Sequence, residues 1–220
     1  MPEASFKRFV TSKALAKTLD LLEIVYRPLG LDKSRMMLGI PAGGDLLEVG
    51  SGTGSSLAGL LNASTITLLE PDVACVAALK ERVVRLGVKE RVTIIDTTVG
   101  QALDREILRP ASFDQVVFSF SLCSIEDPLD SLTRLKDVLK ADGKIYFIEH
   151  TCTTNPKFVQ LQSRFAPIWT SATGGCRLNS DPLKLLEDAG FHPESRAFRR
   201  PMGWPFFKSG VIGSANSTQP

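Results

Sequence analysis

Asp45-Leu-Leu-Glu-Val-Gly-Ser-Gly-Thr-Gly54 is the stretch that decides the fold of this chain. The apolar run from Leu46 to Val49 predicts a strand. Three glycines at alternate positions then break it, before a segment of helical character begins at Ser55. Glycine accepts a positive φ, and without a Cβ it lets a ligand approach main-chain N–H groups. The stretch therefore predicts a strand, a tight turn and a helix, with a site for a nucleoside cofactor at the turn.

A second strand is predicted shortly after this turn, and it ends in an acid. It reads Thr65-Ile-Thr-Leu-Leu-Glu70 and is followed by Pro71. An acid at the tip of this strand can accept both hydrogen bonds of a ribose diol. The turn departs from the dinucleotide fingerprint Gly-x-Gly-x-x-Gly, since Ser55 stands where the last glycine belongs. We therefore expect a nucleoside whose ribose is bound by Glu70.

The rest of the chain alternates between predicted strands and helices. Further strands are predicted at residues 91–96, 113–119, 144–150, 191–198 and 207–215. Helices are predicted at residues 11–27, 34–38, 73–86, 128–139 and 182–189, and another opens at residues 100–102. Continuous apolar strands are typical of parallel strands covered on both faces. The expected fold class is α/β: a Rossmann-like seven-stranded sheet with helices on both faces and an antiparallel last strand.

The length suits a single domain spanning residues 1–220. Within it, residues 1–40 are predicted to form an N-terminal helical cap. Residues 151–179 show no clear periodicity, and a connection of this length usually indicates a functional segment. We interpret residues 151–179 as a lid insert that shapes the substrate site.

Composition and charge argue against several classes of protein. Hydrophobic residues make up 43% and charged residues 23%, and the net charge of +2 is too small to indicate a polyanionic partner. No apolar run approaches the ~20 residues of a membrane span. The four cysteines at positions 75, 123, 152 and 176 form no Cys-x-x-Cys pair. We expect a cytoplasmic protein with no nucleic-acid partner, no membrane span and no metal site, and we predict no oligomeric state.

The first turn, Glu48-Val-Gly50-Ser-Gly52-Thr-Gly54, together with Glu70, resembles the class I S-adenosylmethionine-dependent methyltransferases. Their first motif is commonly Glu/Asp-x-Gly-x-Gly-x-Gly. The resemblance covers nearly the whole chain, because five strands alternating with helices and a hairpin-like end match the methyltransferase sheet. It implies S-adenosylmethionine as the cofactor and methyl transfer as the reaction.

The resemblance also implies which residues contact the cofactor. They lie in the first turn, at the tip of the second strand, in the loop after the third strand, at the end of the fourth strand and in the N-terminal helix: Tyr26, Glu48, Gly50, Ser51, Gly52, Gly54, Glu70, Pro71, Gly100, Gln101, Ser119 and Phe120. Many members have Gly-Asp or Gly-Glu where this chain has Gly100-Gln101. A glutamine can still accept from the adenine amino group. For Tyr26, a core tyrosine is an equal alternative.

A narrower resemblance lies in the second half of the chain. It is to the thiol S-methyltransferases of the methyltransferase-like group, which is related to ubiquinone/menaquinone and phospholipid N-methyltransferases. The residues that carry it are Ser121-Leu-Cys-Ser124, Glu149-His150, Trp169, Gly175-Cys-Arg-Leu-Asn-Ser180 and Gly203-Trp204. It implies a small-molecule acceptor, with a thiol as the first candidate. The residues expected near the acceptor are Leu122, Cys123, Trp169, Cys176 and Trp204.

Some of these residues have alternative interpretations. Cys123 and Cys176 are interpreted as small lining residues and not as nucleophiles. The two tryptophans either wall the acceptor site or pack the lid. His150 is the candidate general base, with a hydrogen-bonded structural histidine as the alternative. A thiol is already a few per cent thiolate at pH 7, so the reaction does not demand a dedicated strong base.

Other functions remain open as alternatives. They are a phospholipid or small-amine N-methyltransferase, a quinone-type C-methyltransferase and a non-catalytic cofactor-binding scaffold. A nucleic-acid methyltransferase is disfavoured, because Arg196, Arg199 and Arg200 form only one small basic cluster. The Asp/Asn-Pro-Pro-Tyr/Phe motif of amino-methylating nucleobase enzymes is also missing at Ser119-Phe-Ser-Leu122.

Overall fold

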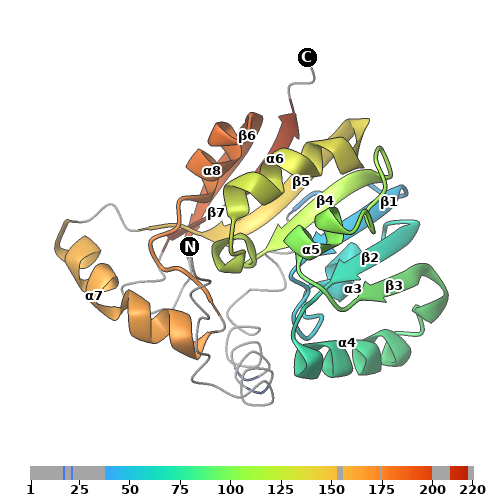
Figure 1. Cartoon of the computed structure of the whole chain (residues 1–220), viewed down its shortest axis with the longest axis horizontal. Coiled ribbons are helices and arrows are strands. Elements are labelled where there is room, and N and C mark those ends of the chain that lie inside the picture. The colour runs from blue at the N-terminus through green and yellow to red at the C-terminus, as the bar shows by residue number, and fades with distance from the viewer. Residues whose placement is uncertain are drawn as a thin grey trace.

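The computed structural model describes residues 17, 21, 38–152, 156–173, 175–199 and 209–217. Its strands are β1 (Asp45–Val49), β2 (Thr65–Leu69), β3 (Val92–Ile95), β4 (Phe113–Ser119), β5 (Leu139–His150), β6 (Phe191–Arg199) and β7 (Ser209–Ser217). They form one sheet in the order β3-β2-β1-β4-β5-β7-β6 (Figure 1). The first five strands are parallel, and β7 runs antiparallel to both β5 and β6. The predicted fold class, with its antiparallel last strand, is confirmed.

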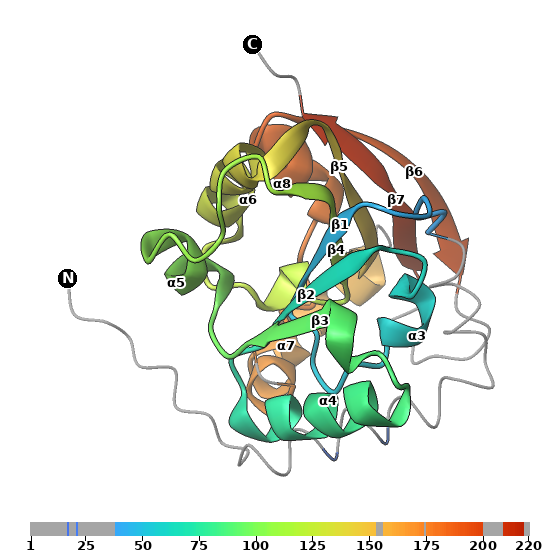
Figure 2. The ribbon, with the colours of Figure 1, turned by 90° about the vertical axis from the view of Figure 1, so that its right-hand side faces the viewer.

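Helices cover both faces of this sheet (Figure 2). One face packs against α5 (Val99–Asp104), α6 (Pro128–Val138) and α8 (Pro182–Asp188), and the other packs against α3 (Leu57–Leu60) and α4 (Val73–Arg85). Strand β4 shows why its sequence is apolar throughout. Val116 and Phe118 enter the first core, whereas Val117 enters the second. Successive side chains of a strand point to opposite faces, so a strand covered on both sides needs apolar residues at every position.

Short polar signals begin and end the helices as the sequence predicts. Asp72 caps α4 by accepting hydrogen bonds from the backbone N–H groups of Ala74 and Cys75, both at 3.0 Å. Gly87 follows α4 with a φ of 67°. The helices α6 and α8 each begin with an Asp cap followed by proline, because proline tolerates the first helical turn, where its missing N–H would have no partner.

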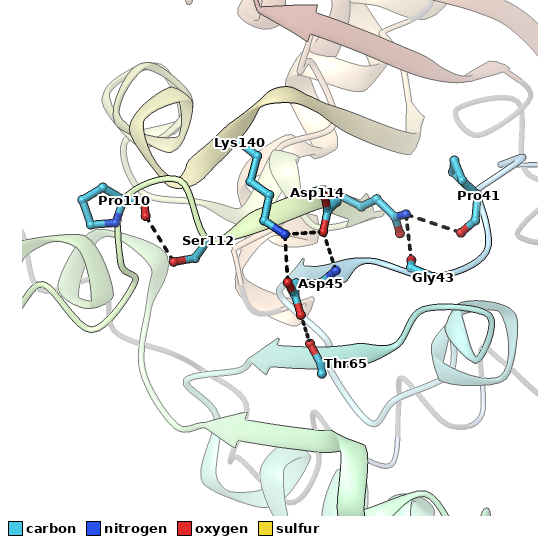
Figure 3. A network of polar contacts seen from close by, with 9 residues as sticks. Pro41, Gly43, Asp45, Thr65, Pro110, Ser112, Asp114 and Lys140 are labelled. Carbon is cyan, nitrogen blue, oxygen red and sulfur yellow. Dashed lines mark hydrogen bonds and ion pairs between the residues drawn. The ribbon is translucent and has the colours of Figure 1, made fainter.

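Charged side chains join β1, β4 and β5 at their amino-terminal ends (Figure 3). Lys140 Nζ lies 2.9 Å from Asp45 Oδ2 and 2.7 Å from Asp114 Oδ2. Asp45 also accepts a hydrogen bond from Thr65 Oγ1 at 2.6 Å, and its backbone N–H donates to Asp114 at 2.7 Å. The three charged side chains are 37–41% exposed. Every charge in this amino-edge network therefore has a partner within the protein while remaining open to solvent.

The structure corrects the predicted junction between α6 and β5. The helix was expected to reach Leu139 and the strand to begin at Lys144, but the helix ends at Val138 and β5 begins at Leu139. The pairing of β4 with β5 shifts register here, so residues 139–144 form a bulge. At Gly143 a Cβ would stand 2.9 Å from the Lys140 carbonyl oxygen. The glycine permits a close backbone approach inside the strand and does not end a helix.

A second correction concerns residues 151–179, where the sequence showed no clear periodicity. Residues Pro156–Ala172 form α7, a helix of 17 residues. Its Pro167 lies inside the helix, and Phe165 and Ile168 remain 40% and 68% exposed. The apolar side chains therefore do not form one buried stripe, which is why the helical pattern was hard to recognise. In Figure 1, α7 lies to the left of the sheet, apart from the helices that cover its faces.

Some predictions fall outside the described residues. They concern most of the N-terminal cap at residues 1–40, including Tyr26, and also Trp204. The single-domain organisation likewise stays a prediction. Among the helices that the structure describes, none combines the length and the apolar composition needed to cross a bilayer.

Candidate active site

The glycine turn after β1 adopts the positive-φ conformation that its sequence predicts. Gly50, Gly52 and Gly54 have φ values of 75°, 55° and 80°. The backbone N–H of Gly50 donates to the Leu69 carbonyl at 2.9 Å, which ties the turn to β2. A Cβ added to Gly50 would stand 2.6 Å from Ser121 Cβ. Gly50 is therefore required both by its positive φ and by the close approach of the loop after β4.

Glu70 holds this turn from the end of β2. It is 7% exposed, and its Oε2 accepts a hydrogen bond from the Gly52 N–H at 2.8 Å. Its Oε1 accepts from the Asp72 N–H, also at 2.8 Å. A carboxylate has about four acceptor positions, so holding the turn is compatible with accepting from a ribose diol. Glu70 thus lies against the glycine turn, and its contact with ribose stays a prediction.

Two buried hydroxyl groups at this edge of the sheet fit a polar ligand. Ser51 Oγ follows β1 and Ser121 Oγ follows β4, and neither has a hydrogen-bond partner within the described ranges. Leaving a buried hydroxyl unpaired costs about 1–3 kcal/mol. A nucleoside with a charged amino-acid tail has the donors and acceptors that these groups lack. The glycine turn and the two hydroxyls therefore fit S-adenosylmethionine.

Glu48 has a partner inside the protein. It is 1% exposed, and its Oε1 accepts a hydrogen bond from Ser56 Oγ, just before α3. This contact joins β1 to the start of the helix across the glycine turn. The structure thus gives Glu48 a role in holding the turn, and its contact with the cofactor stays a prediction.

The loop after β3 contains the residues expected near adenine. Thr98 Oγ1 accepts from the Gln101 N–H at 3.2 Å and so caps α5, where Gly100 occupies the first turn. Gln101 Oε1 already accepts from Thr97 Oγ1 at 2.8 Å. Accepting from adenine as well would therefore use the second lone pair of the same oxygen.

The end of β4 is strained in the backbone. Phe120 follows Ser119 with a φ of 57°, which is rare for a bulky residue. Its N–H donates to the Ile148 carbonyl at 2.9 Å, so strand β5 holds it in place. Such strain is concentrated at functional sites. Ser119, Phe120 and the exposed Pro71 lie at the carboxyl ends of β4 and β2, as expected.

Glu149 is a site residue that the sequence analysis quoted only as part of a resemblance. It is buried near the end of β5, and its Oε1 accepts from the N–H groups of Ser121 and Leu122 at 2.8 and 2.9 Å. Burial raises its pKa to about 7, although the adjacent His150 opposes this shift. The sequence signal that could have identified Glu149 as a site residue is the presence of an acid within the apolar run of β5. Glu149 fixes the loop that presses against the glycine turn.

Three side chains that were expected at the acceptor site, two as lining cysteines and one as a candidate base, meet at the carboxyl ends of β4 and β5. Cys123 lies in the short 3-10 helix η2 (Leu122–Ser124), His150 ends β5, and Cys176 lies in the loop after α7. Cys123 Sγ is 3.3 Å from Cys176 Sγ, which is 3.1 Å from His150 Nε2. All three donor atoms lie within 4.8 Å of one another. The residues are too far apart in sequence to form a recognisable motif.

Within this sulfur–imidazole cluster, one cysteine is a much stronger acid than the other. The hydrogen bond from Cys123, together with the hydrogen bond and charge of His150, lowers the pKa of Cys176 to about 4, despite burial. The hydrogen bond to Cys176 and burial raise the pKa of Cys123 well above its usual value. The indole of Trp169 also lowers the pKa of Cys176. The Cys123 thiol therefore donates a hydrogen bond to Cys176, the cysteine whose pKa lies below its usual value.

The other acceptor candidates are placed differently. Trp169 is half-buried on α7 and contacts the cluster through Cys176. Leu122 is fully buried in the core beneath α6, where it has a packing role. Trp204 lies outside the described residues. The structure thus brings Cys123, His150, Trp169 and Cys176 together.

Comparisons with known proteins agree with this geometry. Residues 47–145 match the family model of a methyltransferase domain. Human thiol S-methyltransferase TMT1B is 28% identical over 147 residues, which is 66% of this chain and 59% of that protein. Human thiol S-methyltransferase TMT1A is 27% identical over 177 residues, 77% of this chain and 69% of that protein. This chain therefore spans less than two thirds of the length of TMT1B.

The fold is also similar to solved structures. A SAM-dependent methyltransferase from Aquifex aeolicus has a TM-score of 0.63 and 18% sequence identity, covering 91% of this chain and 97% of that one. At this identity the similarity concerns the fold alone. It agrees with the seven-stranded sheet.

Proposed function

The chain carries a class I S-adenosylmethionine-dependent methyltransferase domain, and from this premise we propose that it transfers the methyl group to the sulfur of a small-molecule thiol. S-adenosylmethionine supplies an activated methyl group on a sulfonium. The glycine turn and Glu70 are the residues that would hold its nucleoside. Ser51 and Ser121 offer buried hydroxyls beside it.

The observation that carries the choice of acceptor is the sulfur–imidazole cluster of Cys123, His150 and Cys176. Ligands of parallel α/β sheets lie beyond the carboxyl ends of the strands, and this cluster follows β4 and β5 at that edge. Sulfur and imidazole are soft, polarisable groups suited to a sulfur-containing acceptor. The similarity to the human thiol S-methyltransferases TMT1B and TMT1A supports the same choice.

For methyl transfer, the protein mainly needs to align the acceptor with the methyl group. Methyl transfer is an in-line displacement, so its rate depends on holding the acceptor sulfur close to the methyl group with water excluded. A thiolate is intrinsically a strong nucleophile. His150 as a general base belongs to this proposal, and it would act together with Cys176, which lies 3.1 Å from its Nε2.

The proposal is tested by offering the purified protein S-adenosylmethionine with matched panels of small thiols, amines, quinones and phospholipid vesicles. Mass spectrometry should detect the added methyl on sulfur, and the rate should rise with pH as more acceptor is thiolate. Methylation confined to amines or phospholipids would replace the proposal with an N-methyltransferase, and methylation of a quinone ring carbon would indicate a C-methyltransferase. Cofactor binding with no transfer to any panel would indicate a scaffold.

A further inference from the structure

We propose that Cys123, His150 and Cys176 bind one Zn²⁺ ion and leave its fourth coordination position open to the acceptor sulfur. No metal site was expected from the sequence, because no two of these residues are close along the chain. The proposal concerns the sulfur–imidazole cluster alone. It places an ion at the point where the acceptor is expected to lie.

The distances within the cluster suit a single small ion. The Cys123 and Cys176 sulfurs are 3.3 Å apart, and Cys176 Sγ is 3.1 Å from His150 Nε2. With Zn–S bonds of about 2.3 Å and Zn–N bonds of about 2.0–2.1 Å, tetrahedral geometry separates the donors by about 3.5–3.8 Å. Each of these two contacts would need to lengthen by roughly half an ångström, which is within the reach of side-chain rotation. The sulfurs are too far apart for a disulfide, whose bond is about 2.05 Å, and both cysteines are free thiols.

The donor set indicates which ion would bind. Two sulfurs and one imidazole are soft to borderline ligands, so they favour zinc over magnesium or calcium, which prefer oxygen. Catalytic zinc sites commonly have three protein ligands and a fourth position for water or substrate, and two cysteines with one histidine is a known set. The neighbouring carboxylate of Glu149 is turned toward the backbone N–H groups of Ser121 and Leu122.

The backbone around each ligand is already fixed. The Cys123 carbonyl accepts from the Arg177 N–H at 3.1 Å, which joins the loop after α7 to the loop after β4. The Cys176 carbonyl accepts from Thr170 Oγ1 at 2.9 Å. His150 pairs with the neighbouring strand β7. Two loops and the end of strand β5 are thus held together around the donor atoms, which reduces the loss of conformational freedom when an ion binds.

The role of the ion toward the acceptor rests on the proposed function, whereas its binding does not. A thiol that coordinates zinc gives up its proton, which passes to water. The acceptor sulfur would then form the new S–C bond with its electron pair as the sulfonium S–C bond breaks and leaves its electrons on the departing sulfur. The product thioether is neutral and a weaker ligand, so it can leave. In this account His150 is a ligand and not a base.

The binding test uses the full chain, purified under reducing conditions, stripped with a chelator and titrated with Zn²⁺ in competition with a chromophoric chelator. We expect one equivalent of zinc. Co²⁺ should bind at the same stoichiometry and show thiolate-to-cobalt absorption in the near ultraviolet. Cys123→Ser, Cys176→Ser and His150→Ala should each weaken binding at least tenfold. Cys75→Ala, which changes a buried cysteine on α4, is the matched control and should bind as the unaltered protein does.

The possible outcomes distinguish a failure of the zinc site from a failure of the proposed function. Absence of stoichiometric binding, or binding that the three ligand variants do not weaken while their circular dichroism stays native, would overturn the zinc site. Cys123 and Cys176 joined in a disulfide in the reduced preparation would also overturn it. Zinc binding without methylation of any thiol would leave the ion site standing and remove the proposed function. Undiminished thiol methylation by metal-free protein would remove the role of the ion while keeping the function.

Discussion

The two ends of the same parallel strands differ in how their polar groups are satisfied. At the amino ends of β1, β4 and β5, Asp45, Asp114 and Lys140 pair with one another in partial contact with solvent. At the carboxyl ends, Glu149 and Ser121 are buried and keep polar atoms without partners among the residues that the structure describes. Parallel strands place all their carboxyl ends at one edge of the sheet. The polar groups at the amino edge therefore pair with one another, whereas those at the carboxyl edge are available to a ligand.

The comparison predicts that substitutions at the carboxyl edge lower the free energy of unfolding strongly and weaken ligand binding. Substitutions at the amino edge should lower the free energy of unfolding only slightly and leave ligand binding unchanged. The different burial of the two edges explains why the expected losses of stability differ. Exposed ion pairs contribute about 0–1 kcal/mol because solvent screens them. Removing the hydrogen-bond partner of a buried polar group lowers the free energy of unfolding by a larger amount.

The largest expected effect is that of Gly50→Ala, which should lower the free energy of unfolding by about 2–5 kcal/mol. The added Cβ combines a φ of 75° with a 2.6 Å contact to Ser121 Cβ. Gly87→Ala is the matched control, since its φ is 67° but nothing lies within 4 Å of its added Cβ. It should cost only about 1–2 kcal/mol. Urea unfolding measures both, and equal losses would show that the contact with the loop after β4 is unimportant.

Next in size is Glu149→Ala, which should cost about 2–4 kcal/mol because it removes the acceptor of two buried N–H groups. Both belong to the loop after β4, at Ser121 and Leu122. Glu149→Gln keeps an acceptor oxygen and should retain most of the stability. Thermal or urea unfolding of the two variants provides the comparison. If they lose equal stability, the negative charge and not the hydrogen bonds would matter.

The smallest expected effect is that of Asp114→Asn at the amino edge, at most about 1 kcal/mol near neutral pH. The hydrogen bond from Lys140 lowers the pKa of Asp114 below its usual 3.8, and those from Thr65 and Lys140 lower the pKa of Asp45. A lowered pKa gives stability that is present above pH 3.8 and is lost as the pH falls through the folded-state pKa. Unfolding at pH 5 and pH 3 should therefore differ less for Asp114→Asn than for the unaltered protein. An equal difference would show that Asp114 does not contribute to acid sensitivity.

The parts that the sequence predicted well depend on local patterns. The glycine turn at residues 50–54, the strand ending before Glu70 and the helices predicted to begin at residues 128 and 182 each need only a few neighbouring residues, and all are present in the structure. The bulge near Gly143 was missed because Asp-Gly also ends helices. Helix α7 was missed because its apolar residues are not gathered into one buried stripe.

The resemblance placed Cys123 and Cys176 near the acceptor and made His150 the candidate base, but the direct contacts within the sulfur–imidazole cluster depend on tertiary structure and could not be predicted. His150 and Cys176 are 26 residues apart in the chain, and Cys123 and Cys176 are 53 residues apart. The three residues therefore share no local motif. Only the sheet order, which places β4 beside β5, brings the first two together. The loop after α7 then adds the third.

The central claim, that the cofactor binds at the carboxyl edge against Glu70, is tested most directly by calorimetric titration of S-adenosylmethionine into Glu70→Ala and Asp114→Ala. Loss of hydrogen bonds to a charged group should weaken binding to Glu70→Ala by about 1–3 kcal/mol, roughly 5- to 150-fold. The affinity of Asp114→Ala should equal that of the unaltered protein. Unchanged affinity in Glu70→Ala, or an equal loss in both variants, would contradict the claim.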